Sequence, residues 1–395
     1  MEDLFLVGRQ EPLFENDLKK LAPEIAYTVG SSRFLIVGGG GTIGQSVTKK
    51  IFEQNPRCLH VVDISENNLV ELVRDLRSSF GYIDGEFKTF CLDSTSQDFE
   101  IFLRNQGHYD FVFNLSALKH VRSEKDPYTL MRMIDINVIN AINIQKLSSE
   151  LGFHNYFCVS TDKAANPVNL MGASKLIMEK AIVSQGSTIP VKMARFANVA
   201  FSDGSLLHGF RQRLQKNQPI SAPSDVRRYF LSKEEAGELC LTSALFADSN
   251  EIFFPKPSSE LSTISFSQVA ENFLRSNGLE PIKCNSEQEA RDAAKDLKNT
   301  NNWPVHFFES DTTGEKDEEE FFTASETPDF QRFENIGVIQ KRHSDQDESI
   351  EEFLQKIKVL RSSENWDRHE IVEVFRNCLP ELSHQETGKF LDAKM

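Results

Sequence analysis

The sequence predicts an α/β protein whose core is a doubly wound parallel sheet, and three observations support this fold class. Apolar stretches of strand length alternate with helical patterns from residue 31 to about residue 200. The first apolar stretch, residues 34–37, runs directly into four glycines and then into a helical pattern. The second, Cys58–Asp63, ends in an acid. Strands alternating with helices favour parallel pairing, because each helix returns the chain to begin the next strand in the same direction.

The glycine cluster has the pattern of a dinucleotide-binding turn. Gly38, Gly41 and Gly44 have the spacing Gly-x-x-Gly-x-x-Gly. Because glycine has no Cβ, such a turn lets the backbone approach a pyrophosphate, and the helix beginning near Thr42 offers free N–H groups. Asp63 lies about twenty residues further on, where an acid binds the adenosine ribose and repels a 2′-phosphate. The sequence therefore predicts NAD in preference to NADP.

The remaining elements of this part continue the alternation. Ser65 is predicted as the N-cap of a helix through Leu76. Further strands are predicted at residues 87–92, 109–114, 155–160 and 191–196, and helices at 130–151 and 171–181. The motifs discussed below fall at the carboxyl ends of these strands, where doubly wound sheets bind their ligands.

The pattern changes beyond Asn198 and predicts further parts of the chain. Helical patterns at 206–215, 232–247 and 287–297 with a short strand at 252–254 indicate a smaller substrate domain, and patterns at 350–360 and 369–378 indicate a helical tail. The acidic run at 315–320 is predicted to be a solvated face. We therefore divide the chain into an N-terminal arm (1–30), an NAD-binding domain (31–200), a substrate-binding domain (201–340) and a C-terminal helical segment (341–395).

Composition excludes several classes of function. The 395 residues carry a net charge of −15, which argues against general binding to nucleic acid or to anionic membranes. No apolar run has transmembrane length, and the N-terminus lacks the basic start of a signal peptide. The 6 cysteines show no metal-ligand spacing, so we expect reduced thiols, no metal and a cytoplasmic protein.

Several motifs in order carry a family resemblance. Residues 159–164 read Val-Ser-Thr-Asp-Lys-Ala, residues 171–175 read Met-Gly-Ala-Ser-Lys, and residues 227–230 read Arg-Arg-Tyr-Phe. The chain resembles the extended short-chain dehydrogenase/reductases that act on nucleotide sugars, and more narrowly the UDP-N-acetylglucosamine 4,6-dehydratases of the polysaccharide-biosynthesis group. The resemblance covers about residues 5–260 and continues more loosely through residues 313–316, Thr-Gly-Glu-Lys. It implies a Rossmann fold, bound NAD and a UDP-sugar substrate, and residues 6–9 are similar to a segment of larger, membrane-anchored relatives, of which this chain would be a soluble short form.

The resemblance also implies roles for individual residues. In a 4,6-dehydration, hydride leaves C4, a base takes the C5 proton, an acid protonates the departing C6 hydroxyl, and hydride returns to C6. Asp162 is then the C6 acid and Lys163 the C5 base, and Thr161 donates a hydrogen bond to the C4 oxygen. These roles require a raised pKa for Asp162 and a lowered pKa for Lys163. The residues expected to contact NAD are Gly38, Gly41, Thr42, Ile43, Gly44, Asp63, Asp93, Ala117 and Lys175.

Met171 departs from the pattern of the superfamily. Most members have at this position the Tyr of a Tyr-x-x-x-Lys pair, and a thioether cannot transfer the proton that the phenol transfers. An inactive protein is one interpretation. Lys175 nevertheless remains one helical turn further on, and methionine also occurs here in the dehydratase subgroup, so we group Met171 with the catalytic set and favour an active enzyme.

The substrate residues are likewise implied by the resemblance. Arg228, followed by Arg211, is the candidate for the diphosphate, because a guanidinium can bind two phosphate oxygens at once. Lys119 and His120 are expected to line the sugar pocket, and Asn198 to contact the substrate near the diphosphate. Asn140 and Phe201 stand where relatives usually have glycine.

Three hypotheses about function remain open at this point. The first is a retaining-type, NAD-dependent 4,6-dehydratase of a UDP-N-acetylhexosamine, although the sequence does not decide the C5 configuration of the product. The second is a nucleotide-sugar epimerase on the same fold, and the third a non-catalytic NAD-binding protein. We also expect a homo-oligomer, at least a dimer, whose interface is the helix carrying Met131, Ile134, Val138 and Ile139 together with its neighbour.

Overall fold

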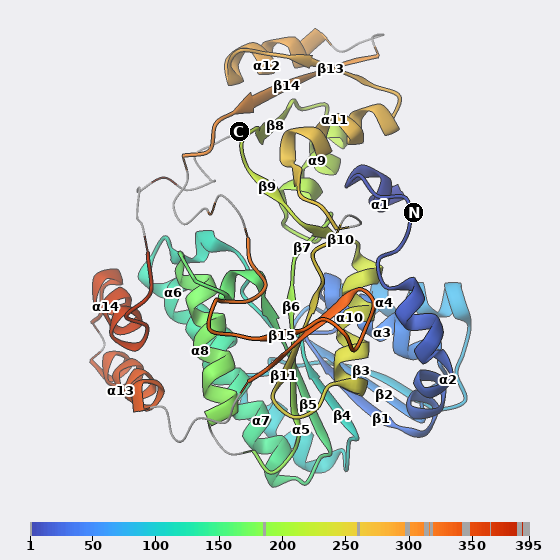
Figure 1. Ribbon diagram of the computed structural model, residues 1–395, viewed down its shortest axis with the longest axis vertical. Coiled ribbons are helices and arrows are strands. Elements are labelled where there is room, and N and C mark those ends of the chain that lie inside the picture. Colours follow the sequence, from blue (N-terminus) through green and yellow to red (C-terminus); the bar gives the residue numbers. More distant parts are fainter. Residues whose placement is uncertain are drawn as a thin grey trace.

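The computed structural model describes residues 2–184, 187–258, 261–296, 301–311, 316, 319–341, 348–363, 365–384 and 389. Its main feature is a nine-stranded sheet with the order β15-β16-β11-β6-β5-β4-β1-β2-β3. Figure 1 shows helices on both sides of this sheet, a smaller unit at one end, and the C-terminal helices α13 and α14 beside α6 and α8.

Six neighbouring parallel strands extend from the edge strand β3 to β6. They are β1 (Arg33–Val37), β2 (Cys58–Asp63), β3 (Glu86–Cys91), β4 (Phe111–Asn114), β5 (Asn155–Thr161) and β6 (Val191–Phe196). Their order in space is β3-β2-β1-β4-β5-β6, and every neighbouring pair is parallel. This is the order of a doubly wound Rossmann sheet. The order in which successive strands are added reverses between β1 and β4, although the strands remain parallel. The predicted fold class is confirmed.

The helices between these strands are largely those expected. The expected ones are α3 (Thr42–Phe52), α4 (Glu66–Phe80) and α8 (Leu170–Ser184), and α5 (Gln97–Asn105) was not predicted. Ser65 caps α4 by accepting a hydrogen bond from the backbone N–H of Asn68 at 3.4 Å, as predicted. The helix predicted at 130–151 is interrupted: α6 (Pro127–Ile134) and α7 (Asn140–Glu150) are joined by a π-helical turn, η2 (Asp135–Ile139).

The segment 201–340 contributes to two parts of the structure. Helix α10 (Lys233–Phe246) packs against α3, β11 (Glu251–Pro255) pairs with β6, and β16 (Ile336–Gln340) pairs antiparallel with β11 and with β15 (Pro328–Asp329). A separate three-stranded sheet forms the smaller unit from β8 (Ile220–Pro223), β13 (Glu280–Lys283) and β14 (Asn302–Phe308). Its helices are α9 (Leu206–Gln215), α11 (Phe266–Ser276) and α12 (Glu287–Ala293).

The C-terminal helices cover the face that was expected to form a dimer. Phe353 of α13 (Glu348–Ser362) and Phe375 of α14 (Arg368–Cys378) belong to one apolar cluster with Met131, Ile134 and Val138. Met131 is 4% exposed, and Ile134 and Val138 are 0% exposed. Helices of the same chain therefore already bury most of the apolar surface on which the prediction of a homodimer was based.

The N-terminal arm is anchored to the body of the protein by a buried ion pair. It contains α1 (Glu2–Leu6) and α2 (Glu15–Ser31), and Arg9 lies between them. The Arg9 guanidinium donates to the two carboxylate oxygens of Glu235 at 2.6 and 2.5 Å. Glu235 in turn accepts from the backbone N–H of Ser232 at the start of α10. The arm is thereby fixed to the helix that packs on α3.

Two further expectations concern membranes and thiols. Within the described part of the chain, no helix combines the length and the apolar content needed to cross a membrane. The six cysteines are all free thiols, and Cys91 alone among them is exposed. Burial raises the pKa of the Cys158 thiol to about 12, so that it stays protonated.

Candidate active site

The turn between β1 and α3 forms a cradle that side chains would block. Gly38 has a φ of 81°, and a Cβ there would lie 2.8 Å from the backbone nitrogen of Ser116. At Gly44 a Cβ would lie 2.2 Å from the carbonyl oxygen of Gly38. The N-cap of α3 is Gly41, which offers no side chain to the first N–H groups of the helix. These N–H groups are therefore available to an anion such as a pyrophosphate.

Asp63 lies beside this cradle at the end of β2. Its Oδ2 accepts a hydrogen bond from the backbone N–H of Gly40 at 2.8 Å, and its Oδ1 accepts from that of Ser65 at 2.8 Å. A carboxylate oxygen can accept more than one hydrogen bond. The carboxylate is thus held in place with acceptor capacity left for ribose hydroxyls. Thr42 lies with Ile43 in the first turn of α3, and its hydroxyl donates to Asp203 Oδ2 at 3.0 Å. This contact links the cradle to the loop after the short strand β7 (Asn198–Val199).

A cavity of about 300 Å³ extends from the cradle along the carboxyl ends of β1, β2 and β4. Its lining includes five of the predicted cofactor residues, which are Gly38, Gly41, Asp63, Asp93 and Ala117. It also includes Arg132, which the sequence analysis did not single out and whose Nη2 lies 3.4 Å from Asp93 Oδ2. Burial would raise the pKa of Asp93, but hydrogen bonds from Thr95 and the charge of Arg132 outweigh it and lower this pKa.

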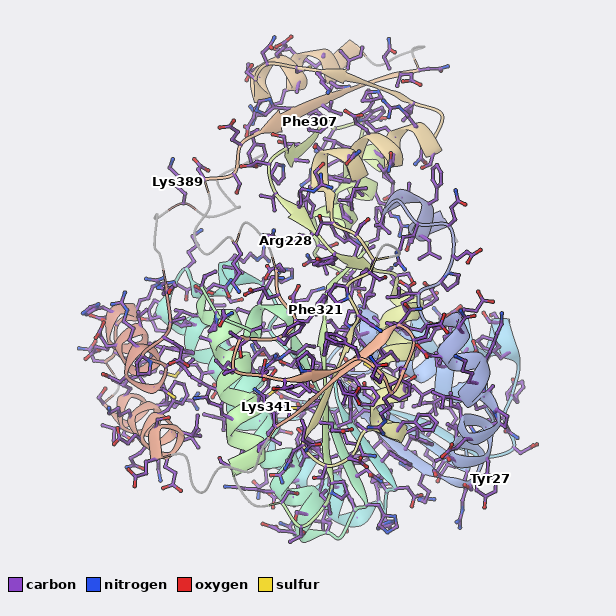
Figure 2. All side chains as sticks on the ribbon, viewed as in Figure 1. Tyr27, Arg228, Phe307, Phe321, Lys341 and Lys389 are labelled. Atoms are coloured by element: carbon purple, nitrogen blue, oxygen red, sulfur yellow. The ribbon has the colours of Figure 1, made fainter. Side chains whose placement is uncertain are left out.

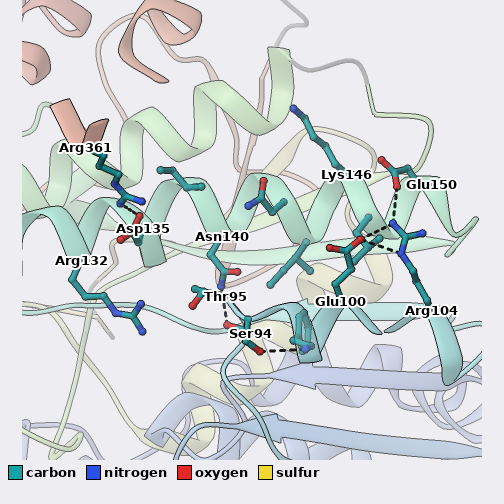
Figure 3. Close-up of a pocket in the computed structure, with 16 residues that line it drawn as sticks. Ser94, Thr95, Glu100, Arg104, Arg132, Asp135, Asn140, Lys146, Glu150 and Arg361 are labelled. Atoms are coloured by element: carbon teal, nitrogen blue, oxygen red, sulfur yellow. Dashed lines mark hydrogen bonds and ion pairs between the residues drawn. The ribbon is translucent and has the colours of Figure 1, made fainter. Parts of the chain in front are cut away.

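A larger cavity of about 630 Å³ lies between α5 and the α6–η2–α7 helix. Figure 3 shows the charged side chains around it, with Arg104 near Glu100 and Glu150. Asn140, at a position where relatives usually have glycine, donates here to Ser94 Oγ at 2.9 Å. The three predicted catalytic residues Thr161, Asp162 and Lys163, called the triplet below, do not line this cavity, so the size of the cavity does not make it the candidate active site.

The triplet lies where β5 passes into a short 3-10 turn, η3 (Asp162–Ala164). Asp162 Oδ1 accepts three hydrogen bonds, from Thr161 Oγ1 at 2.8 Å, from the backbone N–H of Lys163 at 2.9 Å and from Lys163 Nζ at 3.1 Å. Asp162 is 1% exposed. Its Oδ2 is buried and has no hydrogen-bond partner among the described residues.

Burial and charge act differently on the two ionisable members of the triplet. Burial raises the pKa of Asp162, and the attraction of Lys163 offsets part of this rise. The direction is the one that a proton donor requires. Burial by itself would lower the pKa of Lys163, but the carboxylates of Asp162 and Glu319 outweigh it and raise this pKa. The expectation of a lowered Lys163 pKa is therefore wrong for this arrangement, in which the side chain is an ammonium.

Glu319 is a member of the site that the sequence analysis missed. The acidic run around it was expected to be solvated, yet the Glu319 side chain is 3% exposed. Its Oε1 lies 3.3 Å from Lys163 Nζ and 3.5 Å from Arg228 Nε. Phe321, two positions further on, is 2% exposed in the main core, and this apolar neighbour was the available signal that the run turns inward. Of the looser family segment at 313–316, Thr313, Gly314 and Glu315 lie outside the described residues.

Two of the predicted substrate residues come together with the triplet. The short strand β7 (Asn198–Val199) pairs with β10 (Phe230–Leu231), and the backbone N–H of Asn198 donates to Tyr229 O at 3.2 Å. This pairing brings Arg228, at the end of β9 (Arg227–Arg228), beside Asn198, whose Oδ1 accepts from Lys163 Nζ at 3.4 Å. Figure 2 shows Arg228 where the smaller unit meets the large sheet. Arg228 is 3% exposed.

Helix α8 supplies Met171 and Lys175 and packs closely against the triplet. A Cβ at Gly172 would lie 2.2 Å from the carbonyl oxygen of Lys163, so glycine is needed for this approach. Lys175 Nζ donates to Val159 O at 3.0 Å, and burial lowers the pKa of Lys175 to about 8. Met171 is 4% exposed within the apolar cluster of α6 and the C-terminal helices. Its backbone N–H donates to Glu124 Oε1 at 2.9 Å.

The loop after β4 holds two further predicted residues. Asn137, on the π-helical turn, fixes this loop by accepting from Leu118 N at 2.9 Å and donating to Leu118 O at 3.0 Å. Lys119 Nζ donates to Ser202 Oγ at 3.2 Å, and burial lowers the Lys119 pKa. A Cβ on Gly204 would lie 2.8 Å from His120 Nε2. Both side chains therefore face the loop after β7.

Arg211 lies in a different environment from Arg228. Its Nη2 donates to Asp3 Oδ1 at 2.6 Å, and its guanidinium carbon lies 4.3 Å from the centre of the Phe201 ring. Phe201 has a φ of 53°, a left-handed conformation that suits the glycine usual in relatives. Arg211 would have to leave Asp3 before it could bind a diphosphate.

Comparisons with known proteins identify the family and the fold of this chain. Residues 34–341 match the family described as polysaccharide biosynthesis protein. The chain is 32% identical over 229 residues to an uncharacterized membrane protein of Methanocaldococcus jannaschii, covering 56% of this chain and 66% of that one. It is 27% identical over 281 residues to the capsular polysaccharide biosynthesis protein CapD of Staphylococcus aureus, covering 69% of this chain and 44% of CapD. It is 29% identical over 242 residues to a UDP-N-acetylglucosamine 4,6-dehydratase (inverting) of Campylobacter jejuni, covering 58% of this chain and 69% of that one. The matched stretches thus span less than two thirds of the length of CapD and of the archaeal relative.

Solved structures share the fold at low identity. The X-ray structure of Pen from Bacillus thuringiensis has a TM-score of 0.63 at 21% identity and covers 84% of this chain and 98% of that one. The structure of Bordetella bronchiseptica WbmF in complex with NAD+ and UDP has a TM-score of 0.52 at 16% identity and covers 64% and 80%. With the family match extending over most of the sheet and the site, the chain belongs to the polysaccharide biosynthesis protein family.

Proposed function

We propose that this protein is an NAD-dependent nucleotide-sugar 4,6-dehydratase whose substrate is a UDP-N-acetylhexosamine, with UDP-N-acetylglucosamine as the first candidate. The observation that carries the proposal is the Asp162–Lys163 pair at the end of β5, in which Asp162 is buried and Lys163 Nζ lies 3.1 Å from Asp162 Oδ1. Epimerisation at C4 alone needs neither a C6 acid nor a C5 base. A pair of this kind is what elimination across C5 and C6 requires.

NAD fits the residues that are present. The Gly38–Gly44 cradle admits a backbone-bound pyrophosphate, and the Asp63 carboxylate is fixed where it can accept from the adenosine ribose. The relative WbmF, with the same fold, is described in complex with NAD+. When bound, NAD supplies the acceptor and later the donor of the hydride. Lys175 would hold its nicotinamide ribose.

The residues of the chain account for the protons in this reaction. Thr161 donates to Asp162 Oδ1 at 2.8 Å, so a proton from the C4 hydroxyl can pass through the Thr161 hydroxyl to Asp162. Burial favours the protonated form of Asp162, which can then give this proton to the departing C6 hydroxyl. Lys163 takes the C5 proton in its neutral form, which arises when the ammonium releases its own proton to solvent before turnover. With hydride returned to C6 and a proton to C5, one water is lost and the other atoms are conserved.

The remaining roles concern the substrate and its use. Arg228 is proposed to bind the diphosphate, Asn198 to contact the substrate beside it, and Lys119 and His120 to line the sugar pocket. The relatives suggest that the product serves surface polysaccharide or glycan synthesis. We also propose that the protein acts in the cytoplasm as a homo-oligomer. Its interface would be a surface other than the covered α6–α8 face.

Incubation of the purified protein with NAD and a panel of UDP-, dTDP- and GDP-sugars tests the proposal. Mass spectrometry should show a product lighter than one UDP-N-acetylhexosamine by one water. A product of unchanged mass would identify an epimerase, and unchanged substrate in the presence of bound NAD would identify a non-catalytic protein. Proton NMR of the product would assign its C5 configuration, and the name of the Campylobacter jejuni relative describes that enzyme as inverting.

A further inference from the structure

Glu319 joins two parts of the site that the proposed mechanism treats separately. Its Oε1 lies 3.3 Å from the Nζ of Lys163, the proton-transfer residue, and 3.5 Å from the Nε of Arg228, the proposed diphosphate ligand. The Glu319 and Arg228 side chains are each 3% exposed. One buried carboxylate oxygen therefore lies beside two cations, of which Arg228 is buried and Lys163 is 19% exposed.

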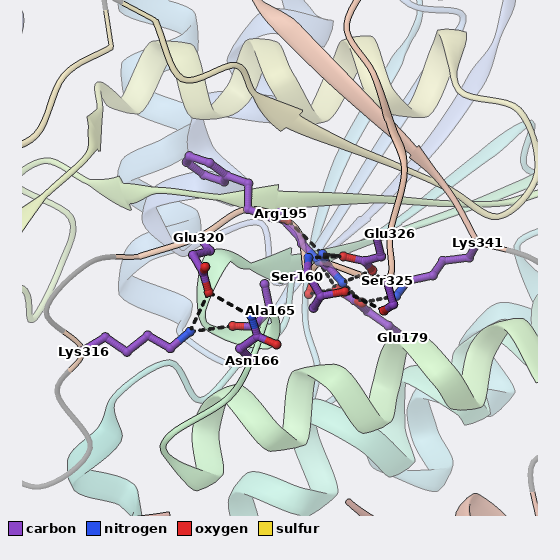
Figure 4. Close-up of polar contacts among 12 residues, drawn as sticks. Ser160, Ala165, Asn166, Glu179, Arg195, Lys316, Glu320, Ser325, Glu326 and Lys341 are labelled. Carbon is purple, nitrogen blue, oxygen red and sulfur yellow. Dashed lines mark hydrogen bonds and ion pairs between the residues drawn. The ribbon is translucent and has the colours of Figure 1, made fainter. Parts of the chain in front are cut away.

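The segment carrying Glu319 is fastened to the large domain on both sides of this contact. Near the residues that follow the triplet, Lys316 Nζ donates to Ala165 O at 2.7 Å, and Glu320 Oε2 accepts from Asn166 Nδ2 at 2.9 Å. On the other side, Arg195 donates to Glu326 at 2.8 and 2.9 Å and to Phe321 O at 2.8 Å. Figure 4 shows both sets of contacts. The position of Glu319 is thus determined by residues flanking the triplet.

Glu319 also has unused hydrogen-bonding capacity in the site. Its Oε2 is buried and has no hydrogen-bond partner among the described residues, as is true of Asp162 Oδ2 and Asn198 Nδ2. A buried acceptor without a partner is costly, and more so when it is charged. Each of these three atoms belongs to a side chain whose other polar atom contacts the Lys163 ammonium.

We propose that Glu319 is a positioning residue that holds Lys163 and Arg228 in one cluster and sets the charge state of Lys163. This inference rests on the proposed function, because the role of Lys163 as a base is part of that proposal. The groups that face Lys163 are Asp162, Glu319 and Arg228, together with the neutral Asn198. When Asp162 holds a proton it no longer attracts the ammonium, and Glu319 remains the carboxylate that keeps Lys163 protonated.

The sign of the expected effect follows from this arrangement. A base must be neutral to take a proton, so kcat/KM should rise as the pH passes the pKa of Lys163. An opposite charge within about 4–6 Å shifts a pKa by about 1–3 units. Glu319→Gln removes that charge at nearly constant shape, and we expect the rising limb of the pH profile to move about one unit or more to lower pH. Glu320→Gln is the matched control, because Glu320 is the adjacent acid, its side chain is 54% exposed, and the amide oxygen of a glutamine can still accept from Asn166 Nδ2.

A second measurement separates this inference from the proposed function. In protein labelled with ¹³C at the lysine Cε, the Lys163 signal is the one lost in Lys163→Met, and its titration reports the Lys163 pKa without any turnover. We expect a lower pKa in Glu319→Gln than in the wild type and no change in Glu320→Gln. If Glu319→Gln does not fold, Glu319→Asp, which withdraws the carboxylate by one methylene, should give a smaller shift in the same direction. An unchanged or raised Lys163 pKa in a folded Glu319 variant overturns the inference, whether or not the protein dehydrates a nucleotide sugar.

Discussion

Replacing Asp162 by Asn separates chemistry from folding in this protein. Asn retains an oxygen that can accept the three hydrogen bonds now made to Asp162 Oδ1, from Thr161 and from two nitrogens of Lys163. It cannot carry the proton that the proposed mechanism delivers to C6. The substitution should therefore leave NAD and nucleotide-sugar binding nearly unchanged and slow the elimination.

The size of the effect can be estimated. Loss of one general acid typically costs about 10²–10⁴ in rate, which at about 1.36 kcal/mol per factor of ten is about 2.7–5.4 kcal/mol of barrier. The stability of the fold, in contrast, should not fall in this variant. Because the folded-state pKa of Asp162 is raised, its carboxyl stabilises the fold below its unfolded pKa, and this contribution is lost as the pH rises through the folded pKa. At neutral pH the neutral Asn should unfold at the wild-type temperature or above it.

The assay is the rate of water loss from the nucleotide sugar by mass spectrometry, with thermal unfolding followed in parallel. Asp98→Asn is the control, because Asp98 is an exposed acid in the first turn of α5. A wild type that dehydrates its substrate and an Asp162→Asn variant that does so within tenfold of the same rate would refute the assignment of Asp162 as the acid. A less active and less stable variant would indicate a structural role.

Three further predictions follow from the same geometry. Asp63→Asn should weaken NAD binding and reduce the preference for NAD over NADP, because it removes a charge that repels a 2′-phosphate. Fluorescence titration with both cofactors measures this preference, and tighter binding of NADP than of NAD by the wild type would contradict the prediction. Glu179→Gln should destabilise the fold by about 3–5 kcal/mol, because it removes a charged partner of the fully buried Arg195. Chemical denaturation measures this free energy of unfolding, and it should be unchanged in the control Glu150→Gln, because the Glu150 side chain is 63% exposed. NAD affinity should fall above about pH 8, where Lys175 loses its charge; an equal fall in Lys175→Met would assign the pH dependence to another group.

The sequence by itself determined the fold class and the cofactor half of the site. Cys58–Asp63 is a strand with the predicted bounds, and Ser65 caps the helix expected to follow it. These features depend on local rules: apolar runs form strands, glycines permit one turn, and a hydroxyl satisfies the first N–H groups of a helix. The parallel order of the strands follows from the helices between them. For the same reason Gly38, Asp63 and Asp93 could be expected at one edge of the sheet.

Only the tertiary structure decided the charge and the surroundings of the triplet. Nothing within the sequence around Lys163 indicates that Glu319, more than 150 positions away, supplies a second carboxylate. The same holds for Arg211, which is engaged by Asp3, and for Met131, which is covered by the C-terminal helices. A pKa depends on every charge within a few ångströms and on the exclusion of water. These are properties of the packed chain, because contacts between segments remote in sequence form only when the domains and the C-terminal helices come together.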